Sequence, residues 1–295
     1  MINIKTGKYI SSLCDAEMVQ SASPTTSIKY RHVKKSHPIT ETLTASYCSG
    51  CIKCWHYLSG QCLYTIRERR QTLGLTYHPR LPKLVTVGDD TKLILYDEET
   101  RTQERIFQAS GAPDMMNGHK SRVFCVCFNP ASNHEIVSGG WDDTIQFWDV
   151  RQPFVLRHIT GVHICGEGIA IRSDGKQILT CAWQKENAVQ LWDYSTEKLI
   201  ANLEPEVYKS QLYCGKFIND IFFVCGGSDN NYIRVVDLRT NSTISGIKNL
   251  PGGVYSIDIG PISATQLKRS RPTDEIDLPK LAFCSDKAIF EIELS

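Results

Sequence analysis

Residues 118–150 read GHKSRVFCVCFNPASNHEIVSGGWDDTIQFWDV, and this stretch decides the fold. The stretch and the residues just after it contain four short β-rich runs: Val123–Phe128, Glu135–Ser138, Thr144–Trp148 and Phe154–Ile159. A turn signal, Asp142-Asp143, separates the second run from the third. Short runs of β-branched and aromatic residues between polar turns are typical of antiparallel strands. We therefore predict a four-stranded antiparallel sheet here.

The same unit recurs along the chain, because a third run repeatedly ends in an aromatic or apolar residue that is usually followed by an acidic one. These residues are Trp55, Tyr96, Trp148, Trp192, Val236 and Ile292. Three of the five steps between them are roughly 40–45 residues long, and the other two contain insertions. A helical period of 3.6 fits none of these stretches. The pattern predicts an all-β chain of repeated sheets.

The unit resembles the WD40 repeat, in which a His, a Ser or Thr, a turn Asp and a Trp form a structural tetrad. The best-matching unit supplies His119, Ser138, Asp142 and Trp148. Other units keep only part of the set: His163, Thr180 and Trp192 without the Asp, Thr86, Asp90 and Tyr96 without the His, and Ser49 in place of the Asp. The resemblance covers nearly the whole chain and implies a WD40 β-propeller of four-stranded antiparallel blades.

Six blades are expected, with seven, or a piece of a longer propeller, as the alternatives. Their approximate bounds are 24–66, 67–110, 118–160, 161–204, 207–248 and 249–295. The sixth lacks a fourth strand, and the family resemblance implies that residues 1–13 supply it and close the ring. Against this, Ile2 then overlaps the position that Ile292 fills. The whole chain, residues 1–295, is predicted to be a single domain.

Two insertions interrupt the repeat. By the resemblance, residues 107–117 extend a link on the top face, and residues 262–279 extend a connection on the bottom face. The second insertion contains a Lys-Arg-Ser-Arg run at 268–271. We favour a solvated loop over a nuclear-import signal for this run, because short basic motifs often match by chance.

Composition excludes several classes of protein. Lys and Arg number 33 against 32 Asp and Glu, so the chain lacks the basic excess of a dedicated nucleic-acid binder or a polybasic membrane anchor. No apolar run is long enough to span a membrane, and the N-terminus lacks the apolar segment of a signal peptide. We expect a cytoplasmic or nuclear protein, or one found in both, whose 12 cysteines are thiols.

The candidate catalytic and metal-binding residues have structural explanations. The tetrad explains His119, Ser138 and Asp142 without a catalytic triad, since no nucleophile elbow surrounds Ser138. Cys48, Cys51 and Cys54, with His56 and Cys62 nearby, form the best metal candidate. Alternation along a strand would point Cys51 and Cys54 to opposite faces, so we predict no metal. The sequence has no Walker A motif and no G-x-G-x-x-G between a strand and a helix, and we predict no cofactor and no small-molecule substrate. The basic residues of the run 67–70 are expected in a solvated loop.

The remaining signal is aromatic. Aligned first strands place Phe124, Tyr213, Tyr255 and Glu167 at equivalent positions, and Trp141 and Asp89 directly precede a turn Asp. In WD40 proteins these positions rim the top of the central channel and bind peptides. The resemblance implies that the rings of Phe124 and Trp141 lie near each other there and that Asp89 adds a carboxylate for a cationic side chain. The competing interpretation is packing between blades. We predict a non-catalytic scaffold that binds basic or aromatic protein segments there. The runner-up is an architectural subunit with rim or bottom-loop contacts, and a propeller enzyme ranks far below.

Overall fold

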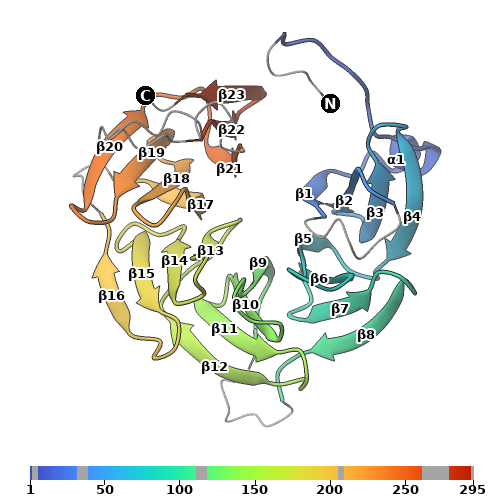
Figure 1. Cartoon of the computed structure of the whole chain (residues 1–295), viewed down its shortest axis with the longest axis horizontal. Coiled ribbons are helices and arrows are strands. Elements are labelled where there is room, and N and C mark those ends of the chain that lie inside the picture. The colour runs from blue at the N-terminus through green and yellow to red at the C-terminus, as the bar shows by residue number, and fades with distance from the viewer. Residues whose placement is uncertain (2–5, 32–38, 111–117, 205–208, 261–278, 294–295) are drawn as a thin grey trace, which may run out of the picture. The chain divides into compact units, whose positions relative to one another are not determined.

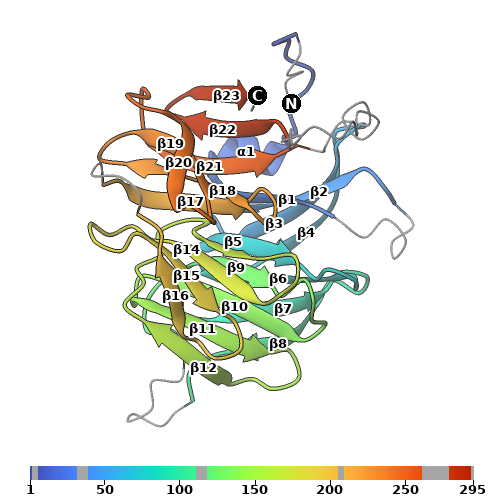
Figure 2. The ribbon, with the colours of Figure 1, turned by 60° about the vertical axis from the view of Figure 1, so that its left-hand side comes forward.

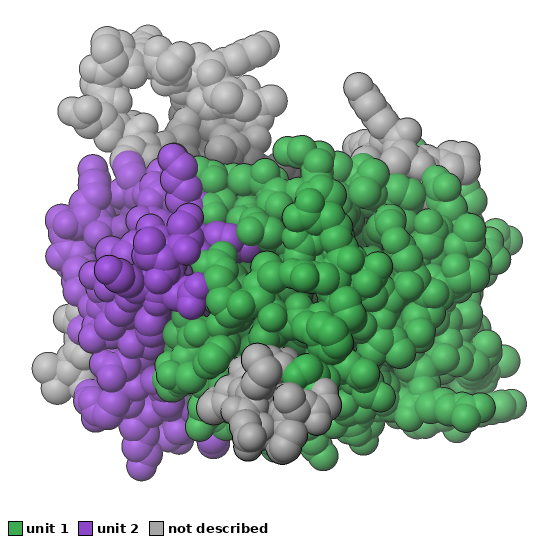
Figure 3. All heavy atoms as spheres, turned by 90° about the horizontal axis from the view of Figure 1, so that it is seen from below, with its two compact units in different colours: residues 1–164, 173–175 green, residues 165–172, 176–295 purple. Residues whose placement is uncertain are grey.

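The computed structural model describes residues 1, 6–31, 39–110, 118–204, 209–260 and 279–293. The insertion residues 111–117 and 262–278, including the run 268–271, lie outside the described residues. The chain forms two compact units: unit 1 comprises residues 1–164 and 173–175, and unit 2 comprises residues 165–172 and 176–295 (Figure 3). Among the described residues, the six-residue α1 (Ala16–Ser21) is the one helix, and every other regular element is a strand. This confirms the predicted all-β class.

Unit 1 contains three four-stranded antiparallel sheets, each with its strands in chain order (Figure 1). The first sheet is β1 (Thr25–Tyr30), β2 (Thr42–Tyr47), β3 (Cys51–His56) and β4 (Gln61–Arg67). The second is β5 (Thr72–Tyr77), β6 (Lys83–Gly88), β7 (Leu93–Asp97) and β8 (Thr102–Phe107). The third is β9 (Val123–Phe128), β10 (Glu135–Gly140), β11 (Thr144–Asp149) and β12 (Val155–Thr160). All four runs predicted from residues 118–159 are confirmed as strands.

Unit 2 contains two four-stranded sheets and one of three strands. The fourth sheet is β13 (Ile169–Ile171), β14 (Gln177–Cys181), β15 (Val189–Asp193) and β16 (Leu199–Asn202). The fifth is β17 (Gln211–Phe217), β18 (Phe222–Ser228), β19 (Tyr232–Asp237) and β20 (Ser242–Ile247). The sixth is β21 (Val254–Ile259), β22 (Leu281–Ser285) and β23 (Ala288–Ile292). The described residues give it no fourth strand, so completion by residues 1–13 stays a prediction.

The turn between the second and third strands differs in length among the six sheets but always contains a left-handed residue. Each turn has one residue with a positive φ: Gly50 (85°), Thr91 (68°), Asp143 (58°), Asn187 (55°), Asp229 (73°) and Asp286 (51°). Glycine, asparagine and aspartate tolerate this left-handed conformation best. Five of the six turn residues are of these types, and Thr91 is the exception.

Within each unit, the first strands of successive sheets lie side by side, as they do in propeller blades (Figures 1 and 2). The core lies between the sheet faces. In unit 1 the fully buried Trp148 belongs to a cluster with Leu93 and Phe107 of the second sheet. Burying such a side chain stabilises the fold by about 1.5–3 kcal/mol. The predicted blade topology is therefore confirmed in both units.

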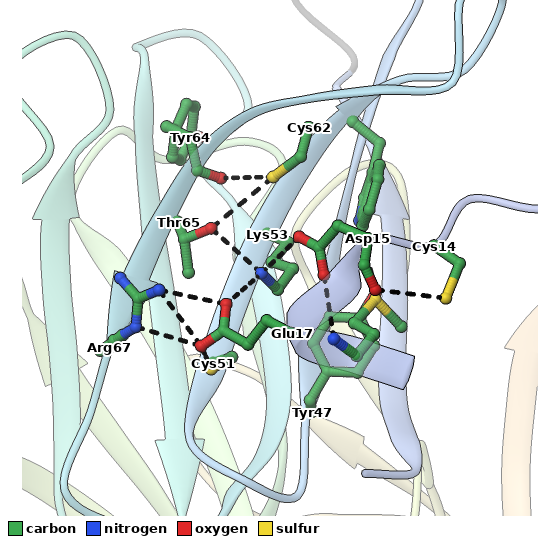
Figure 4. A network of polar contacts seen from close by, with 12 residues as sticks. Cys14, Asp15, Glu17, Tyr47, Cys51, Lys53, Cys62, Tyr64, Thr65 and Arg67 are labelled. Atoms are coloured by element: carbon green, nitrogen blue, oxygen red, sulfur yellow. Dashed lines mark hydrogen bonds and ion pairs between the residues drawn. The ribbon is translucent and has the colours of Figure 1, made fainter. Parts of the chain in front are cut away.

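Helix α1 covers part of the outer face of the first sheet, the face turned away from the second sheet (Figure 4). Leu13 and Met18 pack against a buried cluster that includes Trp55. Beneath the helix, the buried Lys53 Nζ lies 2.7 Å from Asp15 Oδ2 and 2.6 Å from Glu17 Oε2. These two carboxylates compensate a buried charge that the repeat pattern does not predict.

Candidate functional site

The predicted tetrad forms in the third sheet. His119 Nε2 lies 2.7 Å from Ser138 Oγ, and the Trp148 indole donates its N–H to the same oxygen at 2.8 Å. His119 Nδ1 lies 2.9 Å from Asp142 Oδ2, which also accepts the Lys120 backbone N–H. Together the bonds tie the residues before β9 to β10, the following turn and β11.

Burial shows what this Ser–His–Asp set does. Ser138 is fully buried and holds Trp148, so it lacks the exposure that a hydrolase nucleophile needs. Burial acts to raise the pKa of Asp142, but the hydrogen bond and charge of His119 outweigh it and bring the pKa below its ordinary value. The set therefore joins elements of the sheet.

The second sheet has an equivalent network that sequence analysis missed. Glu68 accepts hydrogen bonds from Thr86 and, at 2.8 Å, from the Tyr96 hydroxyl. Arg70 Nε donates to Glu68 at 2.7 Å, and its Nη1 reaches the turn residue Asp90 at 2.5 Å. The Glu68 and Arg70 side chains are 2% and 3% exposed. For Arg70 the expectation of a solvated loop is wrong, because with Glu68 it takes the place of the absent His, whereas Arg67 and Arg69 are exposed.

The fourth sheet departs from the prediction in another way. The Trp192 indole donates to Thr180 Oγ1 at 3.0 Å, as a tetrad would require. His163, however, places its Nδ1 2.6 Å from Asp143 Oδ1 in the turn of the third sheet. The backbone explains this position, because the next residue, Ile164, donates its N–H to Gly140 O at 3.1 Å.

An exposed aromatic group, which we call the Trp141 cluster, comprises Phe124, Trp141, His163 and Arg122. The Trp141 ring lies 5.2 Å from that of Phe124, as predicted, and stacks on His163 at 6.3 Å with an interplanar angle of 18°. The Arg122 guanidinium lies 5.4 Å from the centre of the indole. Trp141 is nevertheless 41% exposed. The cluster is thus an accessible ring fixed by three neighbours.

Local backbone contacts hold the cluster together. Trp141 N–H donates to Arg122 O at 2.9 Å, so the residue before β9 is bonded to the residue after β10. Gly140 makes this approach possible, because a Cβ there would lie 2.1 Å from Arg122 O. The repeat pattern does not predict the contacts of Arg122 and His163 with Trp141.

The other predicted binding residues have contacts or exposure of their own. Asp89 accepts the Gln71 backbone N–H at 3.0 Å. In unit 2 the Tyr213 and Tyr255 rings lie 5.0 Å apart, Tyr255 is 54% exposed, and Glu167 is half-buried. Unit 2 therefore has an aromatic pair of its own.

The cysteine-rich segment behaves as strand alternation predicts. Cys54 belongs to the core between the first and second sheets, whereas Cys51 packs on the outer face of the first sheet. Among the described residues, no group of three or more His, Cys, Asp or Glu side chains is arranged to hold a metal ion. The described part of the chain also contains no helix long and apolar enough to cross a bilayer.

Comparison with known proteins agrees with this geometry. Residues 113–149 match the family model "WD domain, G-beta repeat". Similar proteins include a "Striatin homolog" of Dictyostelium discoideum, 26% identical over 215 residues that cover 68% of this chain and 25% of that protein. "Pre-mRNA-processing factor 19" of Mus musculus is 22% identical over 178 residues, covering 59% of this chain and 32% of that protein.

"Ribosome biogenesis protein YTM1" of Coprinopsis cinerea is 29% identical over 101 residues, covering 34% of this chain and 21% of that protein. The chain spans between 21% and 32% of the length of these three relatives. Residues 113–149 thus contain a WD repeat with its full tetrad, and the sheets in both units have the topology of WD40 blades.

Proposed function

We propose that this chain is a non-catalytic interaction scaffold and that the Trp141 cluster binds a segment of a partner protein. The observation that supports this most directly is an indole that is 41% exposed although three side chains fix it. A rigid, exposed aromatic offers large contact area at little cost in conformational entropy. Because Trp141 lies in a polar turn, its ring stabilises the core less than a buried ring would.

The cluster favours a basic or aromatic partner segment. Arg122 already lies over the indole, so this surface accepts a guanidinium, and a partner's arginine could replace it there. The Asp143 side chain is 64% exposed and lies beside His163, where its carboxylate can pair with an incoming cation. Asp143 takes the role expected of Asp89, whose carboxylate accepts the Gln71 N–H.

The relatives support a scaffold in a nuclear assembly. The names of two of them refer to pre-mRNA processing and to ribosome biogenesis. A nuclear location for this chain is a proposal that rests on those names, and a cytoplasmic location stays a prediction. Burial of the His119, Ser138 and Asp142 side chains supports a non-catalytic role.

A second candidate function is an architectural subunit that makes contacts through the outer strands of its sheets. Exposed apolar residues lie on or beside these strands: Phe154 and Leu156 in unit 1, and Leu199, Ile200, Ile244 and Ile247 in unit 2. Outer strands facing water usually carry polar residues on the exposed side. These side chains therefore offer a separate contact surface in each unit.

The test compares peptide binding by three forms of the chain. Immobilised peptides that differ only in Arg, Lys and aromatic content are titrated with the wild type, Trp141→Ala and Phe154→Ala. We expect basic or aromatic peptides to bind the wild type and Phe154→Ala but to lose affinity for Trp141→Ala. Equal binding of all peptides by Trp141→Ala and the wild type would show that the cluster is not the binding site.

A further inference from the structure

The fifth sheet places a different polar pair at the position of the tetrad serine. Cys225 of β18 pairs across the ladder with Arg234 of β19. In the third sheet the same register position pairs Ser138 with Gln146. The fifth sheet therefore replaces a hydroxyl and an amide with a thiol and a guanidinium.

The guanidinium needs a negative charge close by. Arg234 is only 4% exposed, and its Nε donates to Cys225 Sγ at 3.4 Å. Arginine is not deprotonated in proteins, and a buried charge without a counter-charge is strongly unfavourable. Among the described residues, the structure gives this guanidinium no carboxylate partner. The sulfur of Cys225 is thus the atom placed to supply the charge, as a thiolate.

A second thiol completes the arrangement. Cys181 of β14 is fully buried in the same hydrophobic cluster as Cys225, beside Gly215, which pairs with Cys225 across the ladder. Gly215 leaves room for it, because a Cβ there would lie 2.2 Å from Cys181 Sγ. The hydrogen bond from Cys181 lowers the pKa of Cys225 against the effect of burial, and Arg234 lowers it further. The same bond, together with burial, raises the pKa of Cys181.

We propose that Cys225 and Cys181 form an oxidisable pair, in which the Cys225 thiolate beside Arg234 reacts with a hydroperoxide and Cys181 resolves the product. The Cys225 sulfur attacks one oxygen of hydrogen peroxide, the O–O bond breaks, and hydroxide leaves. Cys225 becomes a sulfenic acid, oxidised by two electrons. Cys181 gives its proton to that hydroxide and attacks the Cys225 sulfur, and the S–S bond forms as a second hydroxide leaves. The disulfide would join the fourth and fifth sheets.

Cys214 of β17 provides a matched control in the neighbouring hydrophobic cluster of the same unit. It is 1% exposed, and its thiol lies near the carbonyl oxygens of Gly226 and Val254, at 3.7 and 3.5 Å. Burial raises the pKa of Cys214. It is therefore as inaccessible as Cys225, but no guanidinium stabilises its anion.

The experiment treats the folded chain with hydrogen peroxide after the exposed Cys14 and Cys284 have been replaced by serine. Samples taken over time are denatured, alkylated and analysed by peptide mass spectrometry. We expect a Cys181–Cys225 peptide pair lighter by two hydrogen atoms, with Cys225 lost at least about tenfold faster than Cys214. In Cys181→Ser the oxidation should stop at a sulfenic acid that dimedone traps. The proposal is overturned if Cys225 and Cys214 are lost at equal rates, or if Cys225 is lost only at the rate of global unfolding. Both comparisons can be made in the variant in which only Cys14 and Cys284 are replaced by serine.

Discussion

His119 Nδ1 lies 2.9 Å from Asp142 Oδ2, and the two side chains are 0% and 7% exposed. Through Ser138 this pair continues to the indole of Trp148, so a buried chain of polar contacts crosses the third sheet. Removing one member leaves the others without partners, and an unpaired buried polar group costs more than the hydrogen bond contributes. The tetrad is thus a sensitive point for stability.

We expect Asp142→Ala to lower the free energy of unfolding by about 1–3 kcal/mol. The neighbouring Asp143→Ala is the control, because the Asp143 side chain is 64% exposed. Its positive φ adds a small strain with alanine, so Asp143→Asn should be measured beside it. Urea unfolding followed by tryptophan fluorescence gives all three values. Equal losses for Asp142→Ala and Asp143→Asn would contradict a structural role for the tetrad.

The lowered pKa of Asp142 also predicts a dependence on pH. The folded chain holds this carboxyl proton more weakly than the unfolded chain does. The stability it contributes is therefore fully present above the unfolded pKa of about 4 and is lost as pH falls through the lower folded value. The stability difference between wild type and Asp142→Asn should shrink between neutral pH and about pH 3. A difference that stays constant over this range would show that Asp142 is not held as the anion.

The Glu68–Arg70 pair gives a second test of the fold. Arg70→Met leaves Glu68 as an uncompensated buried charge, so we expect a loss of about 3–5 kcal/mol. Arg69→Met is the matched control, because Arg69 is exposed and differs by one position. Thermal and urea unfolding of both variants measure the loss of stability in each. Arg70→Met with wild-type stability would mean that the second sheet does not depend on this network.

Completion of the sixth sheet by the N-terminus can be tested by hydrogen exchange. If residues 1–13 supply a fourth strand, the amides of β23 are paired and exchange slowly. Deleting residues 1–12 keeps Leu13, which packs on the first sheet, but opens the edge of β23. We expect faster exchange at Ala288–Ile292 and no change in the central strand β10. Unchanged exchange in β23 would rule out this closure.

The sequence predicted features that depend on local pattern. The strands of the third sheet, its tetrad and the contact between Phe124 and Trp141 follow from a repeat whose turn chemistry is nearly complete. The opposite faces of Cys51 and Cys54 follow from alternation along one strand. Predicting these features requires only the residue types within one sheet.

The features that sequence analysis missed depend on contacts between segments. The charged side chains of Arg70 and Glu68 can be buried because they form hydrogen bonds with Thr86, Tyr96 and Asp90. The composition of the sequence does not predict these contacts. Likewise, Lys53 is buried because α1 brings two carboxylates to it. His163 matched the repeat by position, but the backbone bond at Ile164 directs it to the third sheet.

The most direct test of the scaffold proposal measures affinity and stability on the same variants. Trp141→Ala should weaken binding of the best basic or aromatic peptide by about 1–2 kcal/mol, while its melting temperature falls far less than that of the core variant Phe128→Ala. Phe154→Ala, which removes a ring of similar exposure (48% against 41%), should keep full affinity. The contradicting result is wild-type affinity in Trp141→Ala together with a strongly lowered melting temperature, because the ring would then act in packing and not in binding.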